Sequence, residues 1–588
     1  PPTGASQTVG AGAYLHAHMD AKLSLTGRRW QWPSPVSAPA NVARVPQWML
    51  HLVTQRGLCA ADDIGSYLTP SLATLADPAT MADMTPALER ILGAVRGNET
   101  ITVYGDYDVD GVCATTVLVD FLQRVGAKVG YYIPDRRSEG YGLNRAAVLE
   151  IAKETDLLIT ADCGITAHDE VAAAREAGLD VIIVDHHKVP ETLPNANAVL
   201  NPQRSDCNFP FKGLCAAGVA FMLVIALRRA FRDSGHFAML PEPDVRELLD
   251  VVALATVADM VPLRGVNRTL VTAGLKRIGE TKRPGLQALL EVAEIDATRV
   301  TATDIGFRLG PRINARGRLA HAAEAVELML TADMQRARML AAALDVANRE
   351  RRSVERITAD AAFAQVEALA LTKHAALVVH DPAWHPGVLG LVASRLVGKY
   401  RRPAVVIGEG GKGSARSVEG LNLHDAIAEN SAHLIRFGGH HAAAGVTIES
   451  GHVEAFRAGL ADSVQRVLGA PPFVPTVRLD FEVSPRDLSL DMVDELQRLA
   501  PFGQDNPEPL LVARNLEVRN KRTVGDSGSH LKLGLGSDIA VFDAIGFGLG
   551  ALGNDLPQHI DVAFRLTRNE YRGRESVQME IEDVRPAA

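Results

Sequence analysis

The chain between residues 101 and 185 alternates short apolar runs with longer stretches of helical periodicity. The apolar runs that we expect to form strands are 101–104, 128–133, 156–160 and 180–185. Strands that alternate with helices predict βαβ units around a parallel sheet. Polar residues follow each run directly, and ligands of such sheets bind beyond the carboxyl ends of the strands. The pattern therefore predicts an α/β domain whose polar side chains converge at one sheet edge.

The pattern changes after this region. Residues 214–300 have helical periodicity, and residues 321–372 are rich in Ala, Leu, Glu and Arg without Pro or Gly. The latter stretch predicts one or two long connecting helices. An apolar run at 375–380 opens a second α/β unit, and alternating apolar residues with Gly turns follow the Pro-rich stretch 470–476. This last segment predicts a small β-domain.

The composition is that of an ordinary globular protein, with 47% apolar and 22% charged residues among 588. The longest apolar run, Gly218–Leu227, ends at Arg228, so we expect a buried helix and no membrane segment. The net charge of −9 gives no global support for a nucleic-acid partner, so any basic surface must be local. Five scattered cysteines without metal-ligand spacing are typical of reduced thiols in the cytoplasm.

The first polar loop, GDYDVDG, contains three carboxylates at alternate positions, Asp106, Asp108 and Asp110. A divalent cation relieves the repulsion among such carboxylates, and hard oxygen ligands suit Mg²⁺ or Mn²⁺. A solvated acidic turn after a strand is the alternative interpretation.

Further candidate ligands come from three other places in the chain. Asp162 follows a predicted strand, where a helix N-cap is the alternative interpretation. Asp185, His186 and His187 end another apolar run abruptly, and adjacent histidines at a strand end are unusual. Asp259 interrupts an apolar helical stretch, where a buried carboxylate needs a partner or a metal unless it caps the helix.

Carboxylates and histidines from four places at one sheet edge predict a two-metal hydrolytic site, with ions roughly 3.5–4 Å apart. We expect Asp162 to bridge the two ions. One histidine would ligate a metal, and the other would stabilise the charge of a phosphorane or shuttle a proton.

These segments resemble a known superfamily. GDYDVDG, ADCGI, DHH and VADMVPL, in this order, are similar to the four motifs of the DHH phosphoesterases. YGLN, GFRLGPRINARGRL, LDVANRERR, WHPGVLGLVASRL, GGHHAAAG and APFGQDNPEP are similar to segments of the RecJ family within it, and the similarity runs from about residue 45 to the end. Ala161 departs from the apolar β-branched residue expected before the aspartate, a change that spares the ligand.

The resemblance implies a fold, which we expect to be α/β with a DHH-type parallel-sheet catalytic domain, long connecting helices, a second α/β DHH-associated domain and a C-terminal OB-fold β-barrel. The expected boundaries are a disordered or extended N-terminal segment at 1–45, the catalytic domain at 46–320, connecting helices at 321–372, the substrate-binding domain at 373–468 and the OB-fold-like domain at 469–588.

The resemblance also implies roles for the candidate residues. The two divalent ions, Mn²⁺ or Mg²⁺, would be held by Asp106, Asp108, Asp110, Asp162, His186 and Asp259. His187 would be catalytic, while Asp185 would orient its neighbours. Which of Asp106 and Asp108 ligates directly stays open.

Contacts to DNA are expected from several basic segments. In GKGSARS, Ser414 and Arg416 with flexible backbone form a possible phosphate grip, and a plain Gly-rich turn is the alternative. His440, in GGHHAAAG, is expected at a helix N-terminus suited to an anion. By the resemblance these residues anchor a DNA 5′ end, and Arg136 is a further candidate.

A cluster of arginines in GFRLGPRINARGRL is expected to contact backbone phosphates, with salt bridges inside the protein as the alternative. Its candidate residues are Arg308, Arg312, Asn314 and Arg318. Aromatic and basic residues of the OB-like domain could bind single strands, but none is assigned individually.

The sequence as a whole predicts a metal-dependent 5′-to-3′ exonuclease that hydrolyses single-stranded DNA to mononucleotides in cytoplasmic DNA repair and recombination. The polarity and the single-strand preference come from the resemblance, as do a single-strand-binding protein and a helicase as expected partners. The alternatives are a DHH phosphodiesterase for short oligonucleotides or cyclic dinucleotides, and an inactive DNA-binding scaffold.

Overall fold

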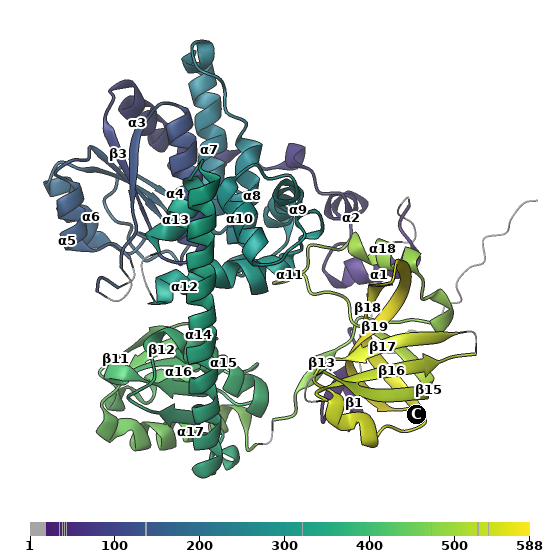
Figure 1. Ribbon diagram of the computed structural model, residues 1–588. Coiled ribbons are helices and arrows are strands. Elements are labelled where there is room, and N and C mark those ends of the chain that lie inside the picture. The colour runs from purple at the N-terminus through teal and green to yellow at the C-terminus, as the bar shows by residue number, and fades with distance from the viewer. Residues whose placement is uncertain are drawn as a thin grey trace, which may run out of the picture. The chain divides into compact units, whose positions relative to one another are not determined.

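The computed structural model describes residues 19–587, except residues 35, 38, 40, 41, 43, 136, 137, 141, 320, 321, 472, 526, 527 and 539. The described residues form two compact units (Figure 1). The larger unit comprises Pro70–Phe473 and Pro501–Asn506. The smaller unit comprises the described residues of Pro1–Thr69, Val474–Ala500 and Pro507–Ala588.

The larger unit begins with a five-stranded parallel sheet, which confirms the predicted α/β domain. Its strand order is β4-β3-β5-β6-β7. The strands are β3 (Thr100–Gly105), β4 (Lys128–Tyr132), β5 (Leu157–Ala161), β6 (Asp180–Val184) and β7 (Ala198–Leu200). All five residues of β5 are buried, as expected for a central strand of a parallel sheet that is covered on both faces. Only β7 was not predicted.

Helices surround this sheet and continue beyond it. Those of the sheet region are α3 (Met84–Arg96), α4 (Val109–Arg124), α5 (Arg145–Ile151), α6 (His168–Glu176) and α7 (Ala216–Asp233). The following helices are α8 (Leu249–Ala258), α9 (Gly265–Gly279), α10 (Pro284–Val292), α11 (Ala302–Asp304), a π-helical turn (Ile305–Leu309), α12 (Gly310–Leu319) and α13 (Ala323–Leu330). No helix in the described part of the chain is long and apolar enough to cross a membrane.

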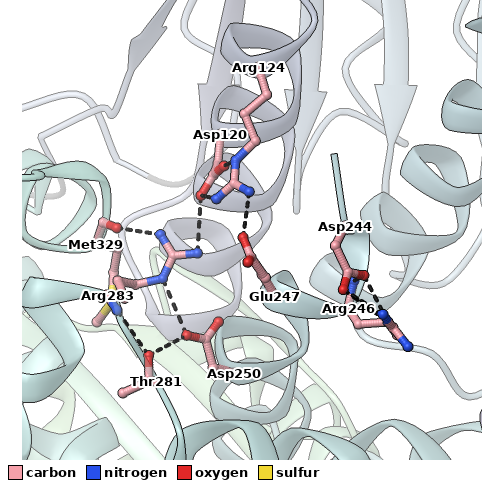
Figure 2. Close-up of polar contacts among 9 residues, drawn as sticks. All are labelled: Asp120, Arg124, Asp244, Arg246, Glu247, Asp250, Thr281, Arg283 and Met329. Atoms are coloured by element: carbon pink, nitrogen blue, oxygen red, sulfur yellow. Dashed lines mark hydrogen bonds and ion pairs between the residues drawn. The ribbon is translucent and has the colours of Figure 1, made fainter. Parts of the chain in front are cut away.

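Helices α4 and α8 are joined by a buried ion network at the ends opposite the sheet edge where β3 terminates (Figure 2). Arg283 lies 3.0 Å from Asp120 of α4 and 3.4 Å from Asp250 of α8, and it donates to the carbonyl of Met329 at 2.6 Å. Thr281 Oγ1 donates to Asp250 at 2.9 Å. The two helices are therefore tied together by a cation that the chain itself supplies.

The long helix α14 (Met334–Ala368) follows and has 35 residues. It confirms the prediction of a long connecting helix in this part of the chain. Leu340 and Leu344 belong to the hydrophobic core of the first sheet region. Ala359, Ala362 and Val366 belong to a core shared with the second sheet. One helix therefore contributes to two cores.

The second α/β region is a five-stranded sheet in the order β11-β12-β10-β9-β8. Its strands are β8 (Leu377–His380), β9 (Ala404–Ile407), β10 (Lys412–Arg416), β11 (Arg436–Gly439) and β12 (Ala443–Thr447). Its helices are α15 (Leu389–Tyr400), α16 (Leu423–Ala428) and α17 (Val453–Leu468).

Two local predictions in this sheet are wrong. The segment GKGSARS is not a loop with free backbone N–H groups, because β10 pairs with β9 on one side and β12 on the other. His440 does not begin a helix but lies in the hairpin between β11 and β12, where its N–H donates to Ala443 O at 2.8 Å. Gly439, with φ 142°, permits this turn, since a Cβ there would lie 2.4 Å from Ala443 O.

The smaller unit contains the predicted β-barrel, consistent with an OB fold. The strand order is β14-β15-β16-β17-β19-β18, and β15 also pairs with β18, which closes the barrel. The strands are β14 (Phe481–Glu482), β15 (Leu511–Val524), β16 (His530–Gly536), β17 (Val541–Gly546), β18 (His559–Tyr571) and β19 (Arg574–Pro586). The unit also contains α1 (Gln47–Gln55), α2 (Ala61–Leu68) and α18 (Leu490–Gln497).

A separate three-stranded sheet of this unit, β1-β2-β13, brings the N-terminal segment into contact with the barrel. Its strands are β1 (Met19–Leu23), β2 (Arg29–Gln31) and β13 (Thr476–Arg478). Trp30 of β2 is 1% exposed and donates from Nε1 to Asp583 Oδ2 at 2.8 Å. The domain boundaries expected from the sequence stay a prediction.

Candidate metal centre

The loop after β3 folds back on the first turn of α4. Asp108 is the N-cap of α4, and its Oδ1 accepts from Asp110 N at 2.9 Å and Gly111 N at 3.1 Å. A Cβ at Gly111 would lie 2.5–2.7 Å from backbone atoms of Asp106, so only glycine permits this close approach. The turn therefore holds all three predicted carboxylates within one short stretch of backbone.

Asp110 is buried and is held by a second helix. Its two carboxylate oxygens accept from Ala216 N at 2.6 Å and Ala217 N at 2.8 Å, at the N-terminus of α7. The partial positive charge of a helix N-terminus stabilises such a carboxylate. This contact was not predicted, although the apolar run that starts at Gly218 indicated a helix in this region.

Asp162 lies immediately after β5 and is 2% exposed. Its backbone has φ 70°, a left-handed conformation that Asp and Asn adopt more readily than most residues. Its N–H donates to Val184 O at 3.0 Å, so the residue is still tied to the neighbouring strand β6. The bend places Asp162 at the same sheet edge as the loop after β3.

Asp185 organises the two histidines that follow β6. Its Oδ1 accepts from His186 N at 2.7 Å and His187 N at 3.0 Å, and lies 2.7 Å from His187 Nδ1. Its Oδ2 accepts from Ile165 N at 3.0 Å. Burial would raise the pKa of Asp185, but the hydrogen bonds and charge of His187 outweigh it and the pKa is lowered. Burial would lower the pKa of His187, but Asp185 raises it.

His186 is the point at which the separate acidic segments meet. Its Nε2 lies 3.2 Å from Asp162 Oδ1, 3.6 Å from Asp110 Oδ2 and 3.7 Å from Asp259 Oδ2. Asp259 is the C-cap of α8, and its Oδ2 is buried without a hydrogen-bond partner among the described residues. Three carboxylates from three elements therefore surround one imidazole nitrogen.

The electrostatics of this cluster show an excess of negative charge. Burial, followed by the charges of Asp110 and Asp108, raises the pKa of Asp259 to about 9. Burial and the neighbouring aspartates also raise the pKa of Asp162 well above its ordinary value. Among the described residues, neither Asp110 nor Asp259 forms an ion pair with a lysine or arginine.

The donor set fits divalent metal ions. Three groups of side chains each have ligand atoms within 4.8 Å of one another: Asp162, His186 and His187; Asp110, His186 and Asp259; and Asp106, Asp108 and Asp162. Carboxylate oxygens with imidazole nitrogens suit Mn²⁺ and Mg²⁺. Because Asp162 and His186 each belong to two groups, the arrangement fits more than one ion. The structure thus brings together all six predicted ligands and His187, with Asp185 behind them.

Two of the predicted DNA contacts in the arginine cluster, Arg308 and Arg312, are engaged within the protein. Arg308 pairs with Asp304 at 3.0 Å and donates to Glu294 O at 2.8 Å. Arg312 pairs with Asp345 at 3.0 Å. Asn314 is half-buried in α12. The side chain of Arg318 and the whole of Arg136 lie outside the described residues.

Ser414, Arg416 and His440 lie in the second sheet region, apart from the metal-ligand groups. Ser414 and Arg416 are half-buried on β10, two residues apart and therefore on one face of the sheet. A Cβ at Gly390 would lie 2.8 Å from an Arg416 guanidinium nitrogen, so the arginine lies beside the first turn of α15. Burial lowers the pKa of Arg416. His440 is exposed.

Sequence reasoning missed two residues beside the histidines. Asn201 Nδ2 donates to His187 O at 2.9 Å, and Gln203 Nε2 donates to His186 O. Both follow β7, the strand that was not predicted. The polar residues directly after the apolar run at 198–200 were the available signal.

Comparisons with known proteins place the three regions of the chain in described families. Residues 100–256 match the DHH family, N-terminal domain. Residues 371–466 match the DHHA1 domain, and residues 479–583 match the RecJ OB domain.

Similar proteins and structures cover most of the chain. The single-stranded-DNA-specific exonuclease RecJ of Dickeya dadantii is 39% identical over 92% of this chain and 96% of its own length. The protein of the same description from Escherichia coli is 36% identical over 92% and 96%. The crystal structure of RecJ in complex with Mn²⁺ from Thermus thermophilus is similar with a TM-score of 0.79 and 32% identity, over 92% of this chain and 76% of that one. The structure from the same organism in complex with Mg²⁺ has a TM-score of 0.73 and 30% identity, over 92% and 75%.

Proposed function

Because this chain belongs to the RecJ family of single-stranded-DNA-specific exonucleases, we propose that it hydrolyses single-stranded DNA at the cluster around His186. The activity depends on divalent metal ions, as the Mn²⁺- and Mg²⁺-bound relatives indicate. Its expected role is in DNA repair and recombination. The observation that carries the proposal is the convergence of Asp110, Asp162 and Asp259 on His186 Nε2.

In this proposal the metal ligands are Asp106, Asp108, Asp110, Asp162, His186 and Asp259. Bound divalent ions would lower the pKa of a water molecule and neutralise charge on the phosphate. Asp110 is fixed by two backbone N–H groups of α7, and Asp162 by its bond to β6. The chain thus holds the ligands in place by backbone contacts, which favours a preorganised site.

His187 is proposed as the residue that stabilises the reacting phosphate. Its Nδ1 lies 2.7 Å from Asp185 Oδ1, which fixes the orientation of the ring, and we assign the contact with the substrate to Nε2. Its side chain is 40% exposed, compared with 13% for His186. Asp185 raises the pKa of His187, which favours the imidazolium form, and the Nε2 proton of that form would neutralise phosphate charge or pass to the leaving oxygen.

We propose that the strand is degraded from its 5′ end to mononucleotides. Ser414 and Arg416, on one face of β10, would grip the terminal phosphate together with His440 and Arg136. Arg308, which is 40% exposed, and Asn314 and Arg318 would contact the following phosphates. Arg312, which is 12% exposed, would support Arg308, to whose carbonyl it donates at 2.7 Å.

The proposal extends to partners and location. A DNA exonuclease that starts at single-stranded ends needs such ends to be produced and protected, which a helicase and a single-strand-binding protein would do. We place the protein in the cytoplasm, which suits a DNA substrate and the five free cysteines.

Digestion of 5′- and 3′-labelled single and double strands with Mn²⁺ tests this function. We expect release of labelled mononucleotide first from the 5′ label of single strands, and loss of this release in Asp162→Asn. Faster cleavage of a dinucleotide than of a long strand would favour the short-oligonucleotide phosphodiesterase instead. No cleavage of any substrate by folded, Mn²⁺-loaded protein would favour the scaffold.

A further inference from the structure

The carbonyl groups of His186 and His187 are both held by side-chain amides. Asn201 is fully buried at the end of β7, and its Nδ2 donates to His187 O at 2.9 Å. Asn201 Oδ1 accepts from Gln203 N at 2.8 Å, which fixes the orientation of the amide. Gln203 Nε2 then donates to His186 O. One short turn after β7 therefore contacts the backbone of both histidines.

The N–H groups of the same two residues are held from the opposite side. Asp185 Oδ1 accepts from His186 N at 2.7 Å and from His187 N at 3.0 Å. The peptide unit between His186 and His187 is therefore held at both of its polar groups, by Gln203 at the C=O and by Asp185 at the N–H, and its rotation would break both hydrogen bonds. Rotation of the units before and after it would break the bond to His186 N or the bond to His187 O. Because the imidazoles are attached to these units, such a rotation would also move His186 Nε2 away from Asp162 Oδ1, which lies 3.2 Å away.

The turn that carries the two amides is itself anchored to the body of the domain. Arg204 donates to Val199 O at 2.6 Å and to Asp83 Oδ2 at 2.6 Å. Asp83 Oδ2 also accepts from Val199 N at 3.0 Å. The amides of Asn201 and Gln203 therefore hold the histidine backbone against a fixed support.

We propose that Asn201 and Gln203 are positioning residues, with Asn201 setting the placement of His187 and Gln203 setting that of His186. This inference rests on the proposed function of the metal centre. It separates two kinetic effects, because His187 is assigned to the reacting phosphate and His186 to the metal. Loss of the Asn201 donor should reduce turnover, and loss of the Gln203 donor should increase the metal requirement.

Asn201→Asp tests the first half of the proposal. Aspartate keeps the size of the side chain and can accept from Gln203 N, but it cannot donate to His187 O. We expect kcat on single-stranded DNA to fall about 10- to 100-fold, the usual effect of losing a residue that orients a site group. The Mn²⁺ concentration for half-maximal activity should stay unchanged. Asn201→Ala, which adds no charge, should lower kcat similarly.

Gln203→Met tests the second half, since methionine has a similar length but no donor. We expect the Mn²⁺ concentration for half-maximal activity to rise about tenfold or more, with kcat recovered at saturating Mn²⁺. Gln203 is exposed, so this variant should fold normally. If neither Asn201 variant folds, Gln203→Met decides the proposal alone.

Asn197 provides a matched control at the other end of β7. Its Nδ2 donates to Asp180 Oδ1 at 2.8 Å and its Oδ1 accepts from Val181 N at 2.9 Å, so it bridges β6 and β7 as Asn201 does, but far from the histidines. Asn197→Asp should leave kcat and the Mn²⁺ requirement unchanged. Equal loss of kcat in the Asn197 and Asn201 variants would overturn the proposal, as would a wild-type Mn²⁺ titration for Gln203→Met. If the wild-type protein itself released no nucleotides, the proposed function would be the part that failed.

Discussion

The buried carboxylates at the two ends of the helix pair α4 and α8 have different kinds of partner. At the end near the sheet edge, Asp110 and Asp259 approach His186 Nε2 at 3.6 and 3.7 Å and have no lysine or arginine partner among the described residues. At the other end, Asp120 and Asp250 share Arg283 at 3.0 and 3.4 Å (Figure 2). The same helices therefore carry one pair of buried acids that shares an arginine, and a second pair, Asp110 and Asp259, for which the described residues supply none.

This difference separates a structural ion network from a ligand site. A buried carboxylate that has its own guanidinium needs nothing from outside the chain. Buried carboxylates that face one another repel unless an external cation binds, and burial with their mutual repulsion raises the pKa of Asp259 to about 9. Whether a buried carboxylate pairs with a lysine or arginine is thus a better indicator of a ligand site than burial alone.

The largest effect is expected from Asp162→Asn, because Asp162 belongs to two of the three metal-ligand groups. Asparagine keeps the shape and tolerates φ 70°, but it removes the negative charge. We expect nucleotide release from single-stranded DNA to fall about thousandfold or more, while the metal-free protein unfolds at the same or a higher temperature.

Asp156→Asn is the matched control for that variant. Asp156 lies just before β5 and accepts from Thr100 N at 2.8 Å, at the opposite edge of the sheet. Its activity should equal that of the wild type. If Asp162→Asn retained its activity, the acidic residues around His186 would not be a metal-ligand site, and the comparison with the structural ion network would fail.

Removal of the cation from the structural network should be the next largest effect. Arg283→Met leaves Asp250 buried without its guanidinium, while Asp120 keeps its ion pair with Arg124, and we expect the free energy of unfolding to fall by about 3–5 kcal/mol. Chemical denaturation measures this change. Arg246→Met, which breaks the surface pair with Asp244 shown in Figure 2, should give no measurable change. Equal destabilisation by both variants would contradict the comparison.

Addition of Mn²⁺ should stabilise the protein through the metal centre, with an effect that depends on pH. In the metal-free protein the pKa of Asp259, about 9, is raised above its unfolded value of about 4, so its stabilising contribution is present below pH about 4 and lost as pH rises towards 9. Mn²⁺ needs the ionised form, so its stabilisation should grow between about pH 6 and 8.

Thermal unfolding with and without Mn²⁺ at each pH measures this effect. At a metal concentration about a hundredfold above Kd we expect a gain of about 2.7 kcal/mol. Asp259→Asn should flatten the pH dependence. A Mn²⁺ effect that decreases with rising pH would show that Asp259 does not control binding.

The smallest effect concerns a buried carboxylate, Asp583, that accepts from two neutral donors and also lies 3.7 Å from Arg28 Nε. Asp583 is fully buried and accepts from Thr26 Oγ1 at 2.6 Å and Trp30 Nε1 at 2.8 Å. Trp30→Phe removes one donor, and we expect the smaller unit to lose about 1–3 kcal/mol in its free energy of unfolding. Trp32→Phe, at a partly buried position on the same segment, should have less effect. A larger loss of stability in Trp32→Phe than in Trp30→Phe would show that packing of the indole ring matters more than the hydrogen bond to Asp583.

The sequence predicted the parts of the metal centre that follow strong local patterns. Apolar runs of four or more residues identified four strands of the first sheet, and Asp106, Asp162 and Asp185 each follow such a run. Parallel topology then required these side chains to meet at one edge. The contact of Ala216 with Asp110 could not be predicted, because it joins segments that are more than a hundred residues apart. The contacts of Asn201 and Gln203 were missed because they follow β7, the short strand that was not predicted.

The errors arose where local composition suggested a different structure. Lys412–Arg416 contains glycines and looks like a phosphate loop, but Gly413 and Ala415 are buried while Ser414 and Arg416 are half-buried, which is the period of a strand. The short strand β7 has only three residues and gave too weak a periodic signal. Strand β2 forms because it pairs with Thr476–Arg478, a partner more than four hundred residues away in the chain.

Because α14 packs into two hydrophobic cores, it limits how the larger unit can move. A helix of 35 residues is about 50 Å long, and its apolar side chains are fixed in one core near Leu344 and in another near Ala359. A bend in α14 between these two positions would break helical hydrogen bonds and loosen the packing of the helix in both cores. The helix therefore acts as a spacer of fixed length between the two cores, and any opening that admits a polymer needs movement elsewhere than in this helix.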